Sequence, residues 1–199
     1  MDRRTTPANA RVAASALRGH VEAPTFTDGE PRTVADPLVD LCKDPGGARD
    51  RQMLLGDLVQ IFEDRDGWSF VQSAKDDYVG YVPTNSLTAP KAATHWVAVP
   101  AGHAYTEPDI KAPVAHPLYF GTRIAMATHM PKFYETTDGV YIPKPILRPL
   151  EHRFSDPATV AQMFFGAPYL WGGNSVAGID CSGLIQAAHL ACGIPCPGD

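Results

Sequence analysis

Proline and glycine occur so often in this sequence that they limit the kinds of secondary structure it can form. The chain has 199 residues, of which 19 are proline and 17 are glycine. Proline removes a backbone hydrogen-bond donor, and glycine favours turns, so a chain rich in both is typical of short strands joined by turns. The sequence therefore predicts a fold built mainly from short β-strands, with helices confined to limited segments.

Residues 35–90 show the alternating pattern expected of such strands. Candidate strands are Val34–Leu41, Asp57–Glu63, Trp68–Ser73 and Tyr78–Pro83. Asp66 and Gly67 stand between two of these runs, and an Asp-Gly pair in that position is a strong signal for a β-hairpin. This region is therefore predicted to form one compact β-domain.

A weak copy of the same pattern follows at residues 91–150. The strings Gly-Asp-Leu-Val-Gln-Ile and Tyr-Val-Pro of the first unit correspond to Gly-Thr-Arg-Ile-Ala-Met and Tyr-Ile-Pro of the second, and Leu87 and Leu147 close the two units. Two small β-barrels of roughly 55 residues each would have small cores and would lean on one another. The alternative is one larger β-domain whose two halves are similar by chance.

The two ends of the chain differ from this central region. Residues 1–34 are polar and predict an extended arm with one short helix at Arg11–Arg18. Residues 151–199 predict two helices. The first begins after Asp156, a favourable cap, and ends at Gly166, while the second begins at Cys181 and ends before Gly193.

Composition excludes some classes of function. The net charge is −5 and no basic patch stands out, so nucleic acid is not expected as a partner. No apolar run is long enough for a membrane span, and the N-terminal residues lack a signal-peptide pattern, so a cytoplasmic location is expected. The sequence leaves the oligomeric state open.

The four cysteines do not indicate a disulfide framework or a metal site. They are Cys42, Cys181, Cys192 and Cys196. In a chain without a signal peptide, four cysteines do not suggest disulfides, and no second thiol or imidazole pair accompanies Cys192 and Cys196 at zinc-site spacing. Neither a structural metal nor a cofactor is expected.

Cys181 is the residue whose predicted position has chemical consequences. A cysteine at the first position of a helix lies next to unpaired backbone N–H groups and the positive end of the helix dipole. Both favour the nucleophilic thiolate, and the same N–H groups can hold the oxyanion of a tetrahedral intermediate. The alternative is an ordinary cysteine packed in the core.

Two strings surround Cys181, Pro-Tyr-Leu-Trp-Gly-Gly-Asn-Ser at 168–175 and Gly-Ile-Asp-Cys-Ser-Gly-Leu-Ile at 178–185. Together they resemble the nucleophile signature of the NlpC-type peptidases. These papain-like enzymes cleave peptidoglycan stem peptides. The repeated β-units resemble the paired bacterial SH3-like domains of one branch, the γ-D-glutamyl-L-diamino acid endopeptidases. The implied fold is α+β, with two SH3-like barrels at 35–90 and 91–150 followed by part of a papain-like peptidase domain.

The resemblance implies roles for individual residues. Cys181 corresponds to the nucleophile, Tyr169 to a tyrosine that supports the oxyanion or the substrate, and Asp180 and Ser182 to residues that hold polar ends of the peptide. The alternatives are core packing for Tyr169, a helix cap for Asp180 and a first-turn hydrogen bond for Ser182. Trp171 is expected to be a scaffold residue beneath the loop.

The resemblance also implies a substrate with a free amino terminus. In this branch the first SH3-like unit walls the site, so the expected partner is a murein peptide that begins with L-Ala. A carboxylate and an aromatic ring suit an ammonium group. Asp57 and Tyr78 are the candidates. The alternatives, which the sequence favours, are an exposed strand-end charge for Asp57 and a barrel aromatic for Tyr78.

The sequence does not supply the base that a cysteine peptidase needs. The one histidine after Cys181 is His189, eight residues along the same helix and about 12 Å away in rise. We therefore expect a C-terminally incomplete peptidase domain that is inactive as it stands. The alternatives are a non-catalytic module that binds cell-wall peptides and a protein whose missing sheet comes from another chain.

Overall fold

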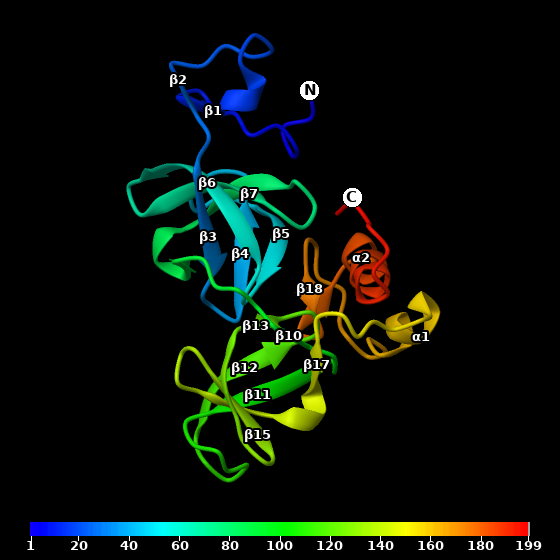
Figure 1. Ribbon diagram of the computed structural model, residues 1–199. Helices are drawn as coiled ribbons and strands as arrows, with labels where there is room; N and C mark the ends of the chain where they lie inside the picture. The colour runs from blue at the N-terminus through cyan, green and yellow to red at the C-terminus, as the bar shows by residue number, and fades with distance from the viewer. Residues whose placement is uncertain (199) are drawn as a thin grey trace.

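The computed structural model describes residues 1–198 and arranges them in four parts (Figure 1). A small N-terminal arm packs at one end of a first β unit, residues 30–88. A second β unit, residues 95–149, lies at the other end of the first. The helical segment, residues 157–198, lies beside both units, with α2 next to β5 of the first unit and α1 farther out (Figure 1).

The N-terminal arm contains two short strands instead of the expected helix. β1 (Val12–Ala14) and β2 (Thr25–Thr27) pair in parallel, with a 3₁₀ turn at Ser15–Leu17 between them. The predicted helix at Arg11–Arg18 is therefore present only as the 3₁₀ turn at Ser15–Leu17, and β1 takes the first half of that range. Val12 is buried against Phe70 of the first β unit, so tertiary packing of a β-branched side chain outweighs local helix propensity here.

The first β unit is a seven-stranded sheet whose strands pair antiparallel in the order β5-β4-β8-β7-β6-β3-β9. The predicted hairpin is present, with Asp66 and Gly67 both at positive φ between β6 and β7. The expected strand at Val34–Leu41 is divided in two. The strands are β3 (Glu30–Val34), β4 (Leu38–Cys42), β5 (Arg49–Leu54), β6 (Leu58–Arg65), β7 (Trp68–Ser73), β8 (Val79–Pro83) and β9 (Leu87–Thr88).

The second β unit repeats part of this geometry. Val82 and Ile142 are fully buried at equivalent strand ends, and each Tyr-Val/Ile-Pro string is followed by a 3₁₀ turn and a short strand that begins with leucine. Its two sheets have the orders β13-β10-β17 and β12-β11-β16-β15-β14. The strands are β10 (His95–Val97), β11 (Ala101–Tyr105), β12 (Val114–Tyr119), β13 (Arg123–Ile124), β14 (Met126–His129), β15 (Phe133–Thr136), β16 (Tyr141–Pro143) and β17 (Leu147–Pro149).

The strand pairings do not close either unit into a barrel. The seven-stranded sheet has β5 and β9 as its edges, and the second unit divides its strands between two sheets. The mainly β architecture with two terminal helices agrees with the α+β prediction. The closed barrels of that prediction are not observed.

The helical segment packs on the second β unit through aromatic side chains. Trp96 and Phe120 lie 5.5 Å apart between ring centroids, and Phe164 contacts Phe120 at the same distance. Ala188 and Ala191 of α2 join this core cluster. The elements of the segment are α1 (Pro157–Gln162), β18 (Asn174–Ser175), β19 (Gly178–Ile179) and α2 (Cys181–Ala191).

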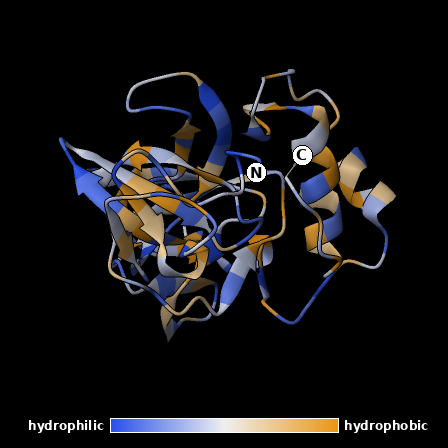
Figure 2. Ribbon diagram, turned by 90° about the horizontal axis from the view of Figure 1, so that it is seen from above, coloured by the Kyte–Doolittle hydropathy of each residue, from blue (hydrophilic) through white to orange (hydrophobic). Residues whose placement is uncertain are grey.

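Both helices begin where the sequence predicts. The Asp156 carboxylate accepts hydrogen bonds from Ala158 N at 3.0 Å and Thr159 N at 3.1 Å at the start of α1. Hydrophobic and hydrophilic residues both occur on the two helices (Figure 2). Within residues 1–198, no helix has the length and apolar character needed to cross a bilayer.

Candidate functional site

Cys181 is the first residue of α2, and its side chain is exposed. Asp180 precedes it as the cap, as the sequence predicts. Asp180 Oδ1 accepts hydrogen bonds from Gly183 N at 2.7 Å and from Ser182 Oγ at 3.0 Å, while Oδ2 accepts from Gly172 N at 2.8 Å. The same carboxylate therefore fixes the start of the helix and the glycine loop before it.

Cys181 lines a cavity of about 230 Å³, which we call the cysteine pocket. It brings together five of the six residues predicted from the sequence to form the site: Tyr78, Tyr169, Asp180, Cys181 and Ser182. Its remaining lining residues are Arg3, Arg4, Asp50, Arg51 and Trp171. The pocket is thus built by the N-terminal arm, the first β unit and the helical segment together.

The aromatic residues of the loop before Cys181 face outward. Tyr169 is 66% exposed and Trp171 is 69% exposed. The backbone of this loop is held to β19, since Leu170 N donates to Ile179 O at 3.2 Å and Ile179 N donates to Pro168 O at 3.0 Å. Core packing of Tyr169 is therefore excluded, and the expectation that Trp171 lies beneath the loop is wrong.

Charged groups of the arm pair with groups of the first β unit at the pocket. Arg3 Nη1 and Nη2 donate hydrogen bonds to the two carboxylate oxygens of Asp50 at 2.6 and 3.1 Å, and these hydrogen bonds raise the pKa of Arg3. Arg4 Nη1 donates to the Tyr78 hydroxyl at 3.5 Å. The hydrogen bonds from Arg4 lower the pKa of Asp2 to about 2. The pocket therefore contains both signs of charge.

Asp50 and Arg3 line the cysteine pocket although the sequence did not predict them as site residues, and Asp57 does not line it. Asp57 closes the turn between β5 and β6, where its Oδ2 accepts from Leu54 N at 3.0 Å and pairs with Lys75 Nζ at 3.0 Å. It lines a different cavity. Asp50, within β5, lines the cysteine pocket instead. In the sequence, the one local feature that could have pointed to Asp50 is its place between two arginines, Arg49 and Arg51, at the start of β5.

No histidine lines the cysteine pocket among the described residues. His189 hydrogen-bonds through Nδ1 to Ile185 O at 2.8 Å, one turn back along α2. His95 and His129 pack against Tyr134 in the second β unit, each with its ring centroid 4.7 Å from the tyrosine ring, in a tilted and an edge-on arrangement. The pocket as described offers a thiol, carboxylates and guanidinium groups. Within residues 1–198 no group of three His, Cys, Asp or Glu side chains is placed to hold a metal.

Two family models match parts of the chain. Residues 41–87 match the bacterial dipeptidyl-peptidase SH3 domain, and residues 166–199 match the NlpC/P60 family. A curated relative, the gamma-D-glutamyl-L-lysine dipeptidyl-peptidase of Bacillus cereus, is 25% identical over 179 residues. That alignment covers 74% of this chain and 52% of the relative, so the chain spans about half of the relative's length.

Solved structures share the fold. An NlpC/P60 family protein from Bacillus cereus superposes with a TM-score of 0.74 at 18% identity, covering 85% of this chain and 75% of that one. An NlpC/P60 endopeptidase from Photobacterium damselae subsp. piscicida gives a TM-score of 0.57 at 14% identity, covering 85% of this chain and 44% of that one. The chain thus joins a segment that matches the bacterial dipeptidyl-peptidase SH3 domain to one that matches the NlpC/P60 family, on a fold that NlpC/P60 proteins share.

Proposed function

We propose that this protein acts as a cysteine peptidase on peptidoglycan stem peptides, with Cys181 as the nucleophile. The observation that carries the proposal is an exposed thiol at the first position of an 11-residue helix, inside a pocket shared with the first β unit. The NlpC/P60 match over residues 166–199 and the dipeptidyl-peptidase relative support it.

The proposed reaction is hydrolysis of the bond between γ-D-glutamate and a diamino acid. The Cys181 thiolate adds to the amide carbon, and the resulting oxyanion accepts hydrogen bonds from the start of α2. The N–H of Gly183 donates to the Asp180 carboxylate, and the N–H of Leu184 donates to the Asp180 carbonyl. We therefore assign the oxyanion to the N–H groups of Cys181 and Ser182. The diamino acid leaves as an amine after taking a proton from solvent water. A second water then hydrolyses the thioester, which releases the γ-D-glutamyl carboxylate and regenerates the thiol.

The pocket wall from the first β unit suits a free amino terminus. Asp50 supplies a carboxylate, and Tyr78 supplies a phenol at the same wall, so we assign Asp50 in place of Asp57 to the substrate ammonium. In the structure the Arg3 guanidinium forms an ion pair with the Asp50 carboxylate at 2.6 Å. The ammonium of an incoming peptide therefore competes with Arg3. A need for a free amino terminus favours released murein peptides that begin with L-Ala, and so a role in recycling them.

A non-catalytic peptide-binding module is the second candidate. The lining of the cysteine pocket, among residues 1–198, contains no imidazole that could act as the base. A module of this kind would bind the same peptide through Asp50, Tyr78 and Ser182 and would not cleave it.

Alkylation of Cys181 tests the nucleophile and the pocket together. We expect iodoacetamide to label Cys181 first, because Cys42 is buried and Cys192 and Cys196 are only partly exposed. L-Ala-γ-D-Glu-L-Lys should slow this labelling, and its N-acetylated form should not. Peptide mapping by mass spectrometry gives the rate at each cysteine.

Hydrolysis separates the two candidates. Release of L-Ala-γ-D-Glu that disappears in Cys181→Ala supports the peptidase, whereas protection without hydrolysis supports the binding module. Full hydrolysis by Cys181→Ala would remove Cys181 from the mechanism. Equal protection by the free and acetylated peptides would contradict the assignment of Asp50.

A further inference from the structure

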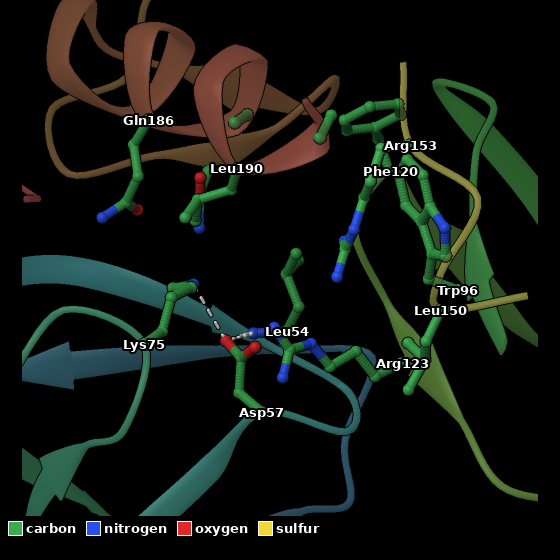
Figure 3. A pocket seen from close by; sticks show the side chains of 14 residues that line it. Leu54, Asp57, Lys75, Trp96, Phe120, Arg123, Leu150, Arg153, Gln186 and Leu190 are labelled. Carbon is green, nitrogen blue, oxygen red and sulfur yellow. Dashed lines mark hydrogen bonds and ion pairs between the residues drawn. The ribbon is translucent and has the colours of Figure 1, made fainter. Parts of the chain in front are cut away.

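A second cavity lies where the first β unit, the second β unit and the helical segment meet (Figure 3). We call it the junction cavity. Its volume is about 60 Å³, and one buried water needs about 10–15 Å³, so it has room for a group of several non-hydrogen atoms. Its apolar walls come from all three parts of the chain: Leu54, Trp96, Phe120, Leu150 and Leu190.

Three cationic side chains enter this cavity, against one carboxylate. Lys75, Arg123 and Arg153 line it together with Asp57. Lys75 Nζ pairs with Asp57 Oδ2 at 3.0 Å, and these side chains are only 13% and 4% exposed. Within residues 1–198, neither Arg123 nor Arg153 has a carboxylate within ion-pair distance. The junction cavity therefore carries two positive charges that no carboxylate balances.

The guanidinium groups of Arg123 and Arg153 are directed into the space between Asp57 and α2 (Figure 3). They come from different parts of the chain, since Arg123 is in β13 and Arg153 follows the second β unit. Like charges repel, so bringing these two groups together costs free energy that a bound anion would offset. Two guanidinium groups that converge on one space are suited to a shared oxyanion, because each offers paired N–H donors.

The remaining polar side chains of the cavity already have partners. Gln186 Oε1 accepts from Arg51 at 2.9 Å, and its Nε2 donates to Asp76 at 3.0 Å. Asn174 Nδ2 donates to Gln52 O at 3.3 Å. These groups therefore do not compensate the charge of Arg123 and Arg153.

We propose that the junction cavity is a binding site for a small carboxylate with a compact apolar body. The carboxylate lies between Arg123 and Arg153, and the apolar body packs against Trp96, Phe120 and Leu190. The site is distinct from the cysteine pocket, because the two cavities share no lining residue. A ligand there contacts all three parts of the chain and stabilises their association.

Isobutyrate is the probe that tests this site, with isobutyramide as its neutral counterpart and inorganic phosphate as a compact oxyanion without an apolar body. Calorimetry and thermal melting at matched ionic strength measure binding to the whole protein. The variants are R123Q and R153Q. R65Q is the control, because Arg65 is an exposed arginine outside the junction cavity.

We expect isobutyrate to bind and to raise the melting temperature, and isobutyramide to do neither. R123Q and R153Q should each weaken isobutyrate binding by about tenfold, the effect of losing one charge-assisted hydrogen-bonding group. R65Q should bind like the unmodified protein. Because Arg153 is exposed, R153Q should fold normally even if R123Q disturbs the junction.

Three results would overturn the proposal. One is equal isobutyrate affinity in R153Q and R65Q. Another is equal binding of isobutyrate and isobutyramide, which would show that charge is not recognised. The third is binding of phosphate without binding of isobutyrate, which would exclude a carboxylate with an apolar body.

Discussion

Asp180 shows how one side chain can determine the position of the reactive group beside it. Its carboxylate is buried and accepts three hydrogen bonds, from Gly172 N, Ser182 Oγ and Gly183 N. Two of these fix the first turn of α2, and the third ties the glycine loop to the same point. The position of Cys181 relative to Tyr169 and Trp171 therefore depends on its immediate neighbour.

Replacing Asp180 should reduce both stability and the reactivity of Cys181. We expect Asp180→Ala to cost about 0.5–2 kcal/mol of unfolding free energy, the range for loss of a helix cap, because three donors lose their acceptor. Urea unfolding measures the free energy, and iodoacetamide labelling measures the thiol. Asp156→Ala is the matched control, since Asp156 caps α1 in the same way. It should lower stability similarly and leave Cys181 labelling unchanged. An equal effect of both variants on labelling would contradict a local role for Asp180.

Strand β5 and helix α2 are joined by a buried polar network. Arg51 Nη2 donates to Gln186 Oε1 at 2.9 Å, and Gln186 Nε2 donates to Asp76 Oδ2 at 3.0 Å. Arg51 Nε lies 3.7 Å from the same Asp76 oxygen, with side chains 5% and 2% exposed. The network lies across the boundary between the first β unit and the helical segment, so it sets how α2 faces the wall of the cysteine pocket.

Gln186→Leu should destabilise the protein, although leucine is similar in size to glutamine and is a good helix former. Arg51 and Asp76 would each lose a buried partner, and leaving such groups unsatisfied costs about 1–3 kcal/mol. Urea unfolding provides the measurement. Gln72→Leu on β7, whose side chain makes one exposed hydrogen bond to Asp77 O, should cost less than about 0.5 kcal/mol. If the two variants cost the same, the network would not hold the two parts together.

The same network makes stability depend on pH in acid. Burial alone would raise the pKa of Asp76, but Lys75, Gln186, Arg51 and Ser73 hold it below its ordinary value. The stabilisation by Asp76 is therefore complete above the ordinary aspartate pKa of about 4 and is lost as pH falls through its lowered pKa. When the unfolding free energy is measured from pH 7 to pH 2, its fall below about pH 4 should be less steep in Asp76→Asn than in the unmodified protein. Asp36→Asn at an exposed position should follow the unmodified protein, and the same steepness in both variants would exclude Asp76 as the source.

At the scale of the whole molecule, the parts are held together by close backbone contact and by an aromatic core. Gly56 meets the second β unit so closely that a Cβ there would lie 2.0 Å from Arg123 O, and Arg123 N donates to Leu55 O at 3.0 Å. Trp96 and Phe120 then pack the second β unit against the helices. The two β units therefore cannot move independently without breaking this contact.

Gly56→Ala should separate the two β units, and Gly139→Ala supplies the comparison. Both glycines have positive φ, 84° and 74°, so each substitution carries a similar backbone cost of about 1–2 kcal/mol. Gly139 has open space where a Cβ would lie. We expect a larger loss of stability in Gly56→Ala, with faster amide hydrogen exchange at Leu55 and Arg123. Equal losses in the two variants would mean that backbone strain alone accounts for the effect at Gly56.

The amino-acid sequence by itself determined the local elements of this protein. The Asp66-Gly67 hairpin and the starts of the two capped helices follow from backbone preferences within a few residues. Only the tertiary structure decided which side chains meet at the cysteine pocket. Asp50 replaces Asp57 there and Arg3 joins it, because pocket neighbours come from segments more than a hundred residues apart, and no local pattern encodes how those segments pack.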